Sequence, residues 1–174
     1  LNLFSYVSNP FTQNAKFDYK LFEKHSIIAQ RLMDDLVDLE LESVEKIINK
    51  IETDPESESD KYRELLLWKK IRNACSGGRR TGTGITALGD ALAALNIRYG
   101  SKESIDITEK IYKTLAIATH TSSVIMAQER GAFSSWEPGR YKQNKFAQRL
   151  TKASSEEIQK AFENTGRRNI ALTT

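Results

Sequence analysis

Cysteine, histidine and long apolar runs are all scarce in this sequence. A single cysteine, Cys75, excludes an internal disulfide and a cluster of thiolate metal ligands, and it fits a reducing compartment. No run approaches the roughly 18 consecutive apolar residues that a membrane-spanning helix needs. The first residues also lack the basic stretch that opens a secretion signal. We therefore expect a cytoplasmic protein without a membrane partner.

The composition is that of an ordinary folded domain. Hydrophobic residues make up 39% and charged residues 28%, which argues against a disordered chain. The net charge of +3 is too small to predict nucleic-acid binding by a basic patch, so we expect no nucleic-acid partner. Acidic residues gather in 34–60 and basic ones in 69–80 and 140–152. We interpret these segments as solvated helix faces, with a phosphate-bearing ligand as the alternative.

Helical periodicity covers most of the chain. Apolar side chains recur every three or four residues after the candidate N-cap Asp18, which predicts a long amphipathic helix over 18–41. The positions of this stripe are Leu21, His25, Ile28, Leu32, Leu36 and Leu39. A shorter helical pattern over 44–51 precedes a charged loop over 54–60.

Further helices are predicted from their end signals. The pattern over 65–71 should close at Gly77-Gly78, where glycine readily takes the left-handed conformation of a helix end. Two more helices are predicted over 87–95 and 102–130, the second stopped by Gly131. Residues 132–140 look irregular, and the run Ser154-Ser155-Glu156-Glu157 opens a last short helix that Gly166 ends.

Three segments have the character of short strands, namely residues 1–7, 79–86 and 168–174. The first is an apolar run, the last alternates apolar and small polar side chains as a half-buried strand does, and we expect both to belong to a larger sheet. The middle one is rich in glycine and threonine, typical of a strand where backbones approach closely. The predicted fold class is therefore α/β and helix-rich, with residues 1–174 forming a single segment.

Two motifs for nucleotide phosphates were considered. Gly82-Thr83-Gly84 with Ala87 has the glycine spacing of a dinucleotide fingerprint, but a polar run precedes it where an apolar strand is required. No glycine-lysine-serine/threonine triplet occurs, which excludes an ATPase-type phosphate loop. We therefore favour a structural role for these glycines.

The other reactive side chains have competing interpretations. The carboxylates Asp34, Asp35, Asp38 and Glu42 could bind a hard cation, but a wet helix face is the commoner role and we predict no metal site. His25 and His120 are expected to be packed histidines. Cys75 precedes a basic segment that would activate a nucleophile, yet it falls on the last turn of a predicted helix, and we favour a structural thiol.

Paired arginines precede two of the predicted strands. Arg79-Arg80 and Arg167-Arg168 could hold phosphates or carboxylates by bidentate hydrogen bonds. Ion pairs at a barrel rim are the alternative that their chemistry favours.

Five blocks resemble consecutive blocks of ribonucleotide reductase large subunits. They are residues 2–7 (NLFSYV), 29–38 (AQRLMDDLVD), 78–90 (GRRTGTGITALGD), 129–133 (ERGAF) and 166–169 (GRRN). The match spans essentially the whole chain. The run that ends in Leu88-Gly89-Asp90 is the most specific block, and it is more similar to the adenosylcobalamin-dependent class than to the class with a separate radical-bearing subunit.

The resemblance implies a slice of a ten-stranded α/β barrel. In the parent enzyme a cysteine thiyl radical would remove the ribose 3′ hydrogen and a cysteine pair would reduce the 2′ carbon, with adenosylcobalamin generating the radical. The catalytic cysteines would precede residue 1, the loop that holds the substrate phosphates would follow residue 174, and Cys75 matches none of the catalytic cysteines. The segment alone should be inactive and bind no cofactor.

The implied partners are the rest of the barrel, a ribonucleotide and a thiol reductant, in a parent that forms a homo-oligomer. No catalytic residue is predicted within the segment. Side chains on its strands that are candidates for the substrate or cofactor pocket are Asn2, Thr81, Thr83 and Asn169. The alternative from a different class is a free-standing helical module that binds nucleotide or a protein partner without catalysis.

Overall fold

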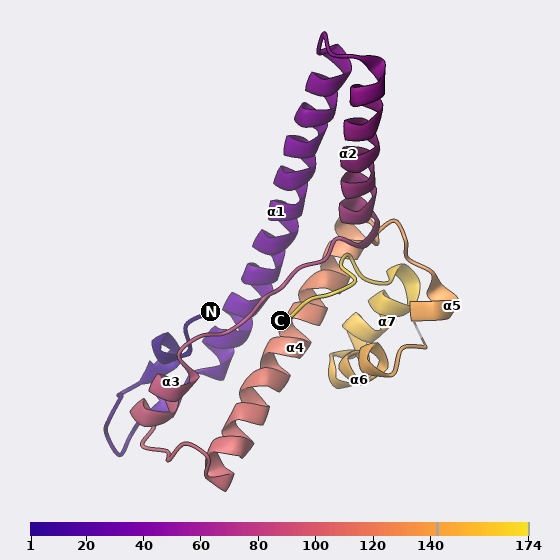
Figure 1. Ribbon diagram of the computed structural model, residues 1–174. Coiled ribbons are helices and arrows are strands. Elements are labelled where there is room, and N and C mark those ends of the chain that lie inside the picture. Colours follow the sequence, from indigo (N-terminus) through magenta and orange to yellow (C-terminus); the bar gives the residue numbers. More distant parts are fainter. Residues whose placement is uncertain (142, 174) are drawn as a thin grey trace.

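Residues 1–141 and 143–173 are described by a computed structural model in which helices dominate (Figure 1). The α-helices are α1 (Tyr19–Thr53), α2 (Glu58–Gly78), α3 (Leu88–Ala94), α4 (Lys102–Arg130), α5 (Pro138–Tyr141), α6 (Lys145–Ala153) and α7 (Glu156–Thr165). A 3-10 helix, η1 (Leu3–Tyr6), leads into the two-residue strand β1 (Val7–Ser8), which pairs antiparallel with β2 (Lys16–Phe17).

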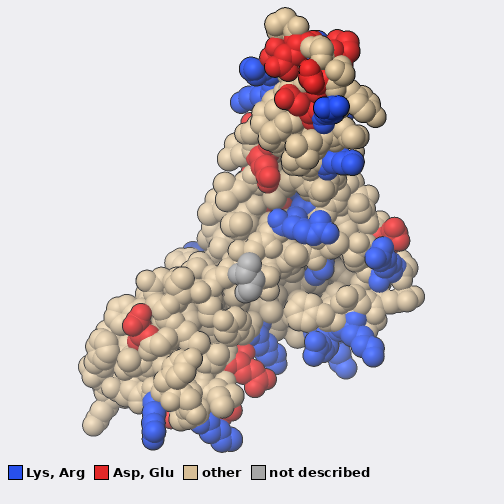
Figure 2. Space-filling model, in the orientation of Figure 1, with Lys and Arg blue, Asp and Glu red and all other residues tan. Residues whose placement is uncertain are grey.

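The helices α1 and α2 form a long hairpin that projects from the rest of the molecule (Figure 1). Asp18 caps α1 as predicted, its carboxylate accepting a hydrogen bond from the amide of Leu21 at 2.9 Å. The two helical patterns over 18–41 and 44–51 form one helix, because no glycine or proline separates them. The loop at the tip is shorter than predicted, since α2 already begins at Glu58. Figure 2 shows acidic side chains gathered at this tip.

The apolar stripe of α1 does not face the interior. Leu32 and Leu36 are 59% and 54% exposed, whereas the buried side of the same helix carries Phe22, Gln30 and Asp34. Polar side chains can occupy the inner side because partners on other segments satisfy their hydrogen bonds. The inner side of α1 is therefore polar over residues 26–34, whereas its buried residues from Val37 onward are apolar.

The end of α2 differs from the prediction. Gly77 and Gly78 both lie within the helix, and Arg79 is the residue that takes the left-handed conformation, with φ of 44°. That conformation costs a non-glycine residue roughly 1–2 kcal/mol. The side chain of Arg79 offsets the cost with hydrogen bonds to the carboxylates of Asp34 and Asp38, at 2.8 Å each.

The three predicted strands are extended segments rather than regular strands. In residues 1–7 the strand prediction is wrong for Leu3–Tyr6, which form η1, whereas Asn2 makes an isolated bridge to Thr86 and Val7 belongs to β1. Residues 79–86 and 168–173 make only isolated bridges, and Thr174 lies outside the described residues. The described residues therefore show a helix-rich slice, and a ten-stranded barrel is not visible in them.

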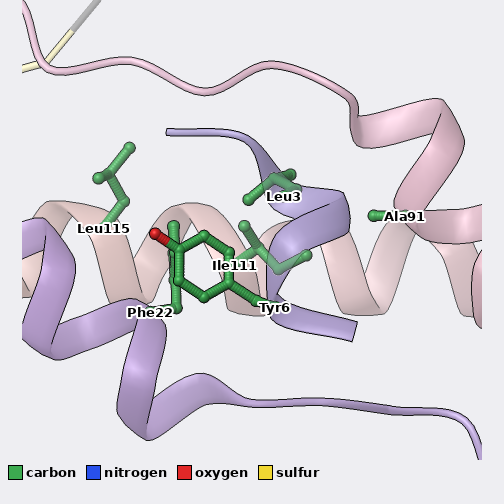
Figure 3. Packing of buried hydrophobic residues seen from close by; sticks show 6 residues of the cluster. All are labelled: Leu3, Tyr6, Phe22, Ala91, Ile111 and Leu115. Atoms are coloured by element: carbon green, nitrogen blue, oxygen red, sulfur yellow. The ribbon is translucent and has the colours of Figure 1, made fainter. Parts of the chain in front are cut away.

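Two apolar clusters hold the helices together. Figure 3 shows the first, in which Leu3, Tyr6, Phe22, Ala91, Ile111 and Leu115 join η1, α1, α3 and α4. The second joins α4 to α6 and α7 through Val124, Ala147, Ile158, Ala161 and Phe162. The helices predicted over 87–95, over 102–130 and after Ser155 are confirmed. Neither α6 nor the short α5, which begins inside the stretch 132–140 predicted to be irregular, was predicted. None of the described helices is both long and apolar enough to cross a membrane.

Candidate functional site

Three extended segments lie side by side across α1 and α4 (Figure 1). Asn2 bridges Thr86 and Thr83 bridges Thr173, both in parallel orientation, so residues 81–86 form the central segment. Backbone hydrogen bonds hold both borders. The amide of Leu3 donates to Thr86 at 3.0 Å, and the amide of Thr83 donates to Leu172 at 2.9 Å. The three predicted strand regions are thus brought together as neighbours.

The central segment has one buried side and one open side. Thr81 and Thr83 are 8% and 4% exposed and point toward α1, whereas Arg80 and Thr86 are exposed. Gly82 and Gly84 alternate with the buried threonines, so they belong to the open side. In Figure 1 no described helix lies in front of this segment.

Gln30 of α1 is the centre of the contacts behind this segment. Its Nε2 donates to Thr81 Oγ1 at 2.9 Å and to Asn169 Oδ1 at 3.2 Å, and its Oε1 accepts from Thr83 Oγ1 at 3.0 Å. The glutamine is fully buried. One amide therefore ties two neighbouring segments to the same helix.

Asn169 continues this network toward α4. Its Oδ1 accepts from Ser123 Oγ at 2.9 Å, and its Nδ2 donates to Asp34 Oδ1 at 2.8 Å and to the carbonyl of Arg79 at 3.1 Å. Its backbone amide donates to Ser123 Oγ at 3.0 Å. All of the polar atoms of its side chain are satisfied, which holds Asn169 in one orientation.

The carboxylate of Asp34 is buried among arginines. Arg79 Nε lies 2.8 Å from Asp34 Oδ1, and Arg168 Nε and Arg130 Nη1 lie 3.3 Å and 3.5 Å from Oδ2. Burial by itself would raise the pKa of Asp34, but hydrogen bonds from Arg79 and Asn169 and the arginine charges lower it below its usual value. Asp34 is therefore an ionised group inside the protein.

Arginines also neighbour the carboxylates that could form a cation site. Ligand atoms of Asp34, Asp35 and Asp38 all lie within 4.8 Å of one another. Arg79 pairs with Asp34 and Asp38, and Arg130 pairs with Asp35 at 2.7 Å. All three carboxylates that could hold a metal ion are thus paired with arginine side chains.

The paired arginines have separate roles. Arg79 and Arg168 both turn inward to Asp34, whereas Arg80 is exposed. Arg167 is buried, donates from Nη2 to the carbonyl of Ile170 at 2.7 Å, and has a pKa lowered by burial. Arg79 and Arg168 thus bind a carboxylate rather than a phosphate in this structure, and the carboxylate that they bind, Asp34, is buried.

The two histidines are packed, as predicted. Tyr6 Oη lies 3.2 Å from His25 Nδ1. His120 is fully buried, with Nε2 3.1 Å from Thr151 Oγ1, and burial followed by the charge of Arg167 lowers its pKa to about 4. Neither histidine is placed with a serine or cysteine as in a catalytic triad.

Cys75 is not an activated thiol. Burial raises its pKa, and the neighbouring carboxylate of Glu40, 3.7 Å from the sulfur, raises it further. A nucleophilic cysteine needs a lowered pKa. The interpretation as a structural thiol agrees with this environment.

Of the four predicted pocket residues, three are brought together. Thr81, Thr83 and Asn169 meet at Gln30, whereas Asn2 lies at the exposed outer border, where its Oδ1 accepts from the amide of Phe4 at 3.0 Å. Sequence reasoning missed Gln30. The available signal was the four-residue spacing of the polar residues Ser26, Gln30 and Asp34, which puts them on one helix face.

Comparison with known proteins gives a consistent picture. The family described as "Ribonucleotide reductase, barrel domain" matches residues 1–174. A vitamin B12-dependent ribonucleoside-diphosphate reductase of Mycobacterium tuberculosis is 24% identical over 128 residues, which are 74% of this chain and 15% of that protein. One of the same description from Thermoplasma acidophilum is 27% identical over 136 residues, or 78% of this chain and 14% of that protein. The chain thus spans about one seventh of the length of these relatives.

Proposed function

The chain belongs to the ribonucleotide reductase barrel-domain family, and from this we propose that it forms part of the catalytic barrel of an enzyme that converts ribonucleotides to deoxyribonucleotides. The observation that carries the proposal is the family match along residues 1–174. The three parallel segments backed by α1 and α4 support it, because helices behind neighbouring parallel strands are how an α/β barrel is built. The parent is an oxidoreductase of the cytoplasm that serves DNA synthesis.

The chemistry of the parent follows from its family. A cysteine thiyl radical removes the ribose 3′ hydrogen, and a thiol reductant restores the cysteine pair that reduces the 2′ carbon. Cys75, with its raised pKa and its contact with Glu40, takes no part in these steps. Residues 1–174 contribute the wall that holds the neighbouring catalytic loops in place, and the segment alone is inactive.

Relatives named as vitamin B12-dependent ribonucleoside-diphosphate reductases support adenosylcobalamin as the cofactor and a diphosphate as the substrate. When bound, this cofactor supplies the initiating radical. Neither histidine is placed to ligate the cobalt, because His25 is engaged by Tyr6 and His120 is fully buried.

Within the wall, the pocket candidates divide between two positions. The exposure of Asn2 at the border of the open side supports a contact with a ligand there. Thr81, Thr83 and Asn169 shape the pocket from behind, because their side chains turn toward Gln30. Gly82 and Gly84 have no side chains, and they therefore leave room on the open side for substrate or a catalytic loop.

The test uses the full-length parent with adenosylcobalamin, a ribonucleoside diphosphate and dithiothreitol, with deoxyribonucleotide measured by chromatography. We expect product from the full-length protein, as a homo-oligomer, and none from residues 1–174 alone. A full-length protein without product, or a segment that binds the nucleotide as a soluble monomer, contradicts the proposal and favours a free-standing binding module.

The open side has its own test in the full-length protein. Gly84→Ala adds a methyl group there, and we expect KM for the ribonucleotide to rise about tenfold. Gly89→Ala is the matched control, because a Cβ at Gly89 meets nothing within 4 Å. Equal KM values for the two variants would exclude the open side as part of the pocket.

A further inference from the structure

A fully buried glutamine in the middle of a long helix requires an explanation. Glutamine is mostly found at the surface, because burial of its amide is costly unless every polar atom finds a partner. Gln30 is 0% exposed and meets this demand with three short contacts, all to side chains outside its own helix. Its partners belong to the central segment and to the segment at residue 169.

These contacts set the relation between the two segments. The backbone bonds from Thr81 to Ala171 and from Thr83 to Leu172, at 3.2 Å and 2.9 Å, hold the segments side by side. They do not determine how deeply each segment sits against the helix layer. Gln30 contributes to this depth, because its Nε2 reaches Thr81 and Asn169 at the same time, and Asp34 and Ser123 also hold Asn169.

We propose that Gln30 is a positioning residue for ribonucleotide reduction, holding the pocket wall through Thr81, Thr83 and Asn169. The proposal rests on the proposed function. Gln30 touches no reacting atom, since it lies on the helix side of the wall. Its effect on the rate comes from placement, because a displacement of about 1 Å in a positioned group can lower a rate by on the order of a hundredfold.

The decisive variant is Gln30→Met in the full-length reductase. Methionine has nearly the same length and removes all three hydrogen bonds. We expect kcat to fall at least tenfold while KM for the ribonucleoside diphosphate stays within about twofold, because the loss acts on the transition state rather than on binding. Gln128→Met, at an exposed position of α4, is the surface control and should match wild type.

A control for stability separates positioning from mere support of the fold. The buried hydroxyl of Ser122 donates to the carbonyl of Ile27 at 2.8 Å and joins α4 to α1 without touching the wall. Ser122→Ala should lower Tm but leave kcat unchanged when both enzymes are assayed well below Tm. If Gln30→Met behaves in the same way, with a lower Tm and an unchanged kcat, Gln30 is only structural and the proposal is wrong.

A milder variant covers the case in which Gln30→Met does not fold. Thr83→Val keeps the shape of the side chain and removes only the bond to Gln30 Oε1, and we expect a fall in kcat of about threefold to tenfold with unchanged KM. Wild-type kcat in a folded Thr83→Val enzyme would then overturn the positioning role. Failure of the proposed function gives a different result, since the wild-type parent itself would then form no deoxyribonucleotide.

Discussion

The buried histidine of α4 should make this fold sensitive to mild acid. Thr151 Oγ1 donates to the carbonyl of Ala147, so His120 Nε2 must be the donor in its contact with Thr151. The proton is thus assigned to Nε2 from the hydrogen-bond network. His120 Nδ1 is buried without a partner among the described residues, so a second proton there would create an unpaired buried charge.

The magnitude follows from the lowered pKa. His120 binds its second proton at about pH 4 in the folded protein, against 6.5 for an ordinary histidine. The unfolded chain therefore takes up the proton first, and the stability that is present above pH 6.5 is lost as the pH falls toward 4. One pKa unit corresponds to about 1.4 kcal/mol, so the free energy of unfolding should fall by roughly 2–3 kcal/mol between pH 7 and pH 4.5.

The assay is urea unfolding followed by circular dichroism at several pH values, for wild type and His120→Phe. Phenylalanine keeps a ring in contact with Phe162, whose centroid lies 5.4 Å from that of His120, and Thr151 retains its bond to Ala147. The variant should lose the pH dependence between 6.5 and 5, where most carboxylates do not titrate. Parallel pH profiles for the two proteins in this range would refute the reasoning.

Three further substitutions or reactions test the network and its surroundings. Asp34→Ala should cost about 3–5 kcal/mol in urea unfolding, because it leaves the buried guanidinium of Arg79 with only the half-exposed carboxylate of Asp38 and removes the carboxylate that Arg168 contacts, whereas Asp35→Ala should cost at most about 1 kcal/mol. Equal losses would contradict this role. Cys75 should react with iodoacetamide at pH 7.5 more slowly than free cysteine, measured by mass spectrometry, and a faster reaction would mean that its pKa is lowered. Ser155→Ala should lower stability by about 1 kcal/mol through loss of the cap at Ile158, and an unchanged Tm would show that the cap is dispensable.

Helix ends were predictable because their causes are local. Asp18, Ser101 and Ser155 each accept a hydrogen bond from an amide three residues ahead, and the same interaction is what makes such residues recognisable in a sequence. The stop at Gly131 is local too, since its φ of 83° suits glycine. The left-handed Arg79 was not predictable, because its compensation comes from Asp34 and Asp38, about 40 residues away.

The candidate site divides in the same way. Threonines at 81 and 83 and an asparagine at 169 were recognisable as unusual polar residues on predicted strands, and the structure does bring them together. Their orientation toward Gln30 was hidden, because strand alternation says that neighbouring residues face opposite ways but not which face meets the helices. The apolar stripe of α1 predicted that the leucine face of this helix is buried, whereas the buried face carries Gln30 and Asp34.

The sequence by itself determined the family, the principal helices with their caps, and the absence of an activated cysteine pair, because motifs and capping depend on residues close together in the chain. Only the tertiary structure decided that Asp34 is ionised among three arginines and that Gln30 ties two segments to one helix. The physical reason is that burial and hydrogen bonding between residues 45 to 139 positions apart set the charge and orientation of these groups, and no local pattern records them.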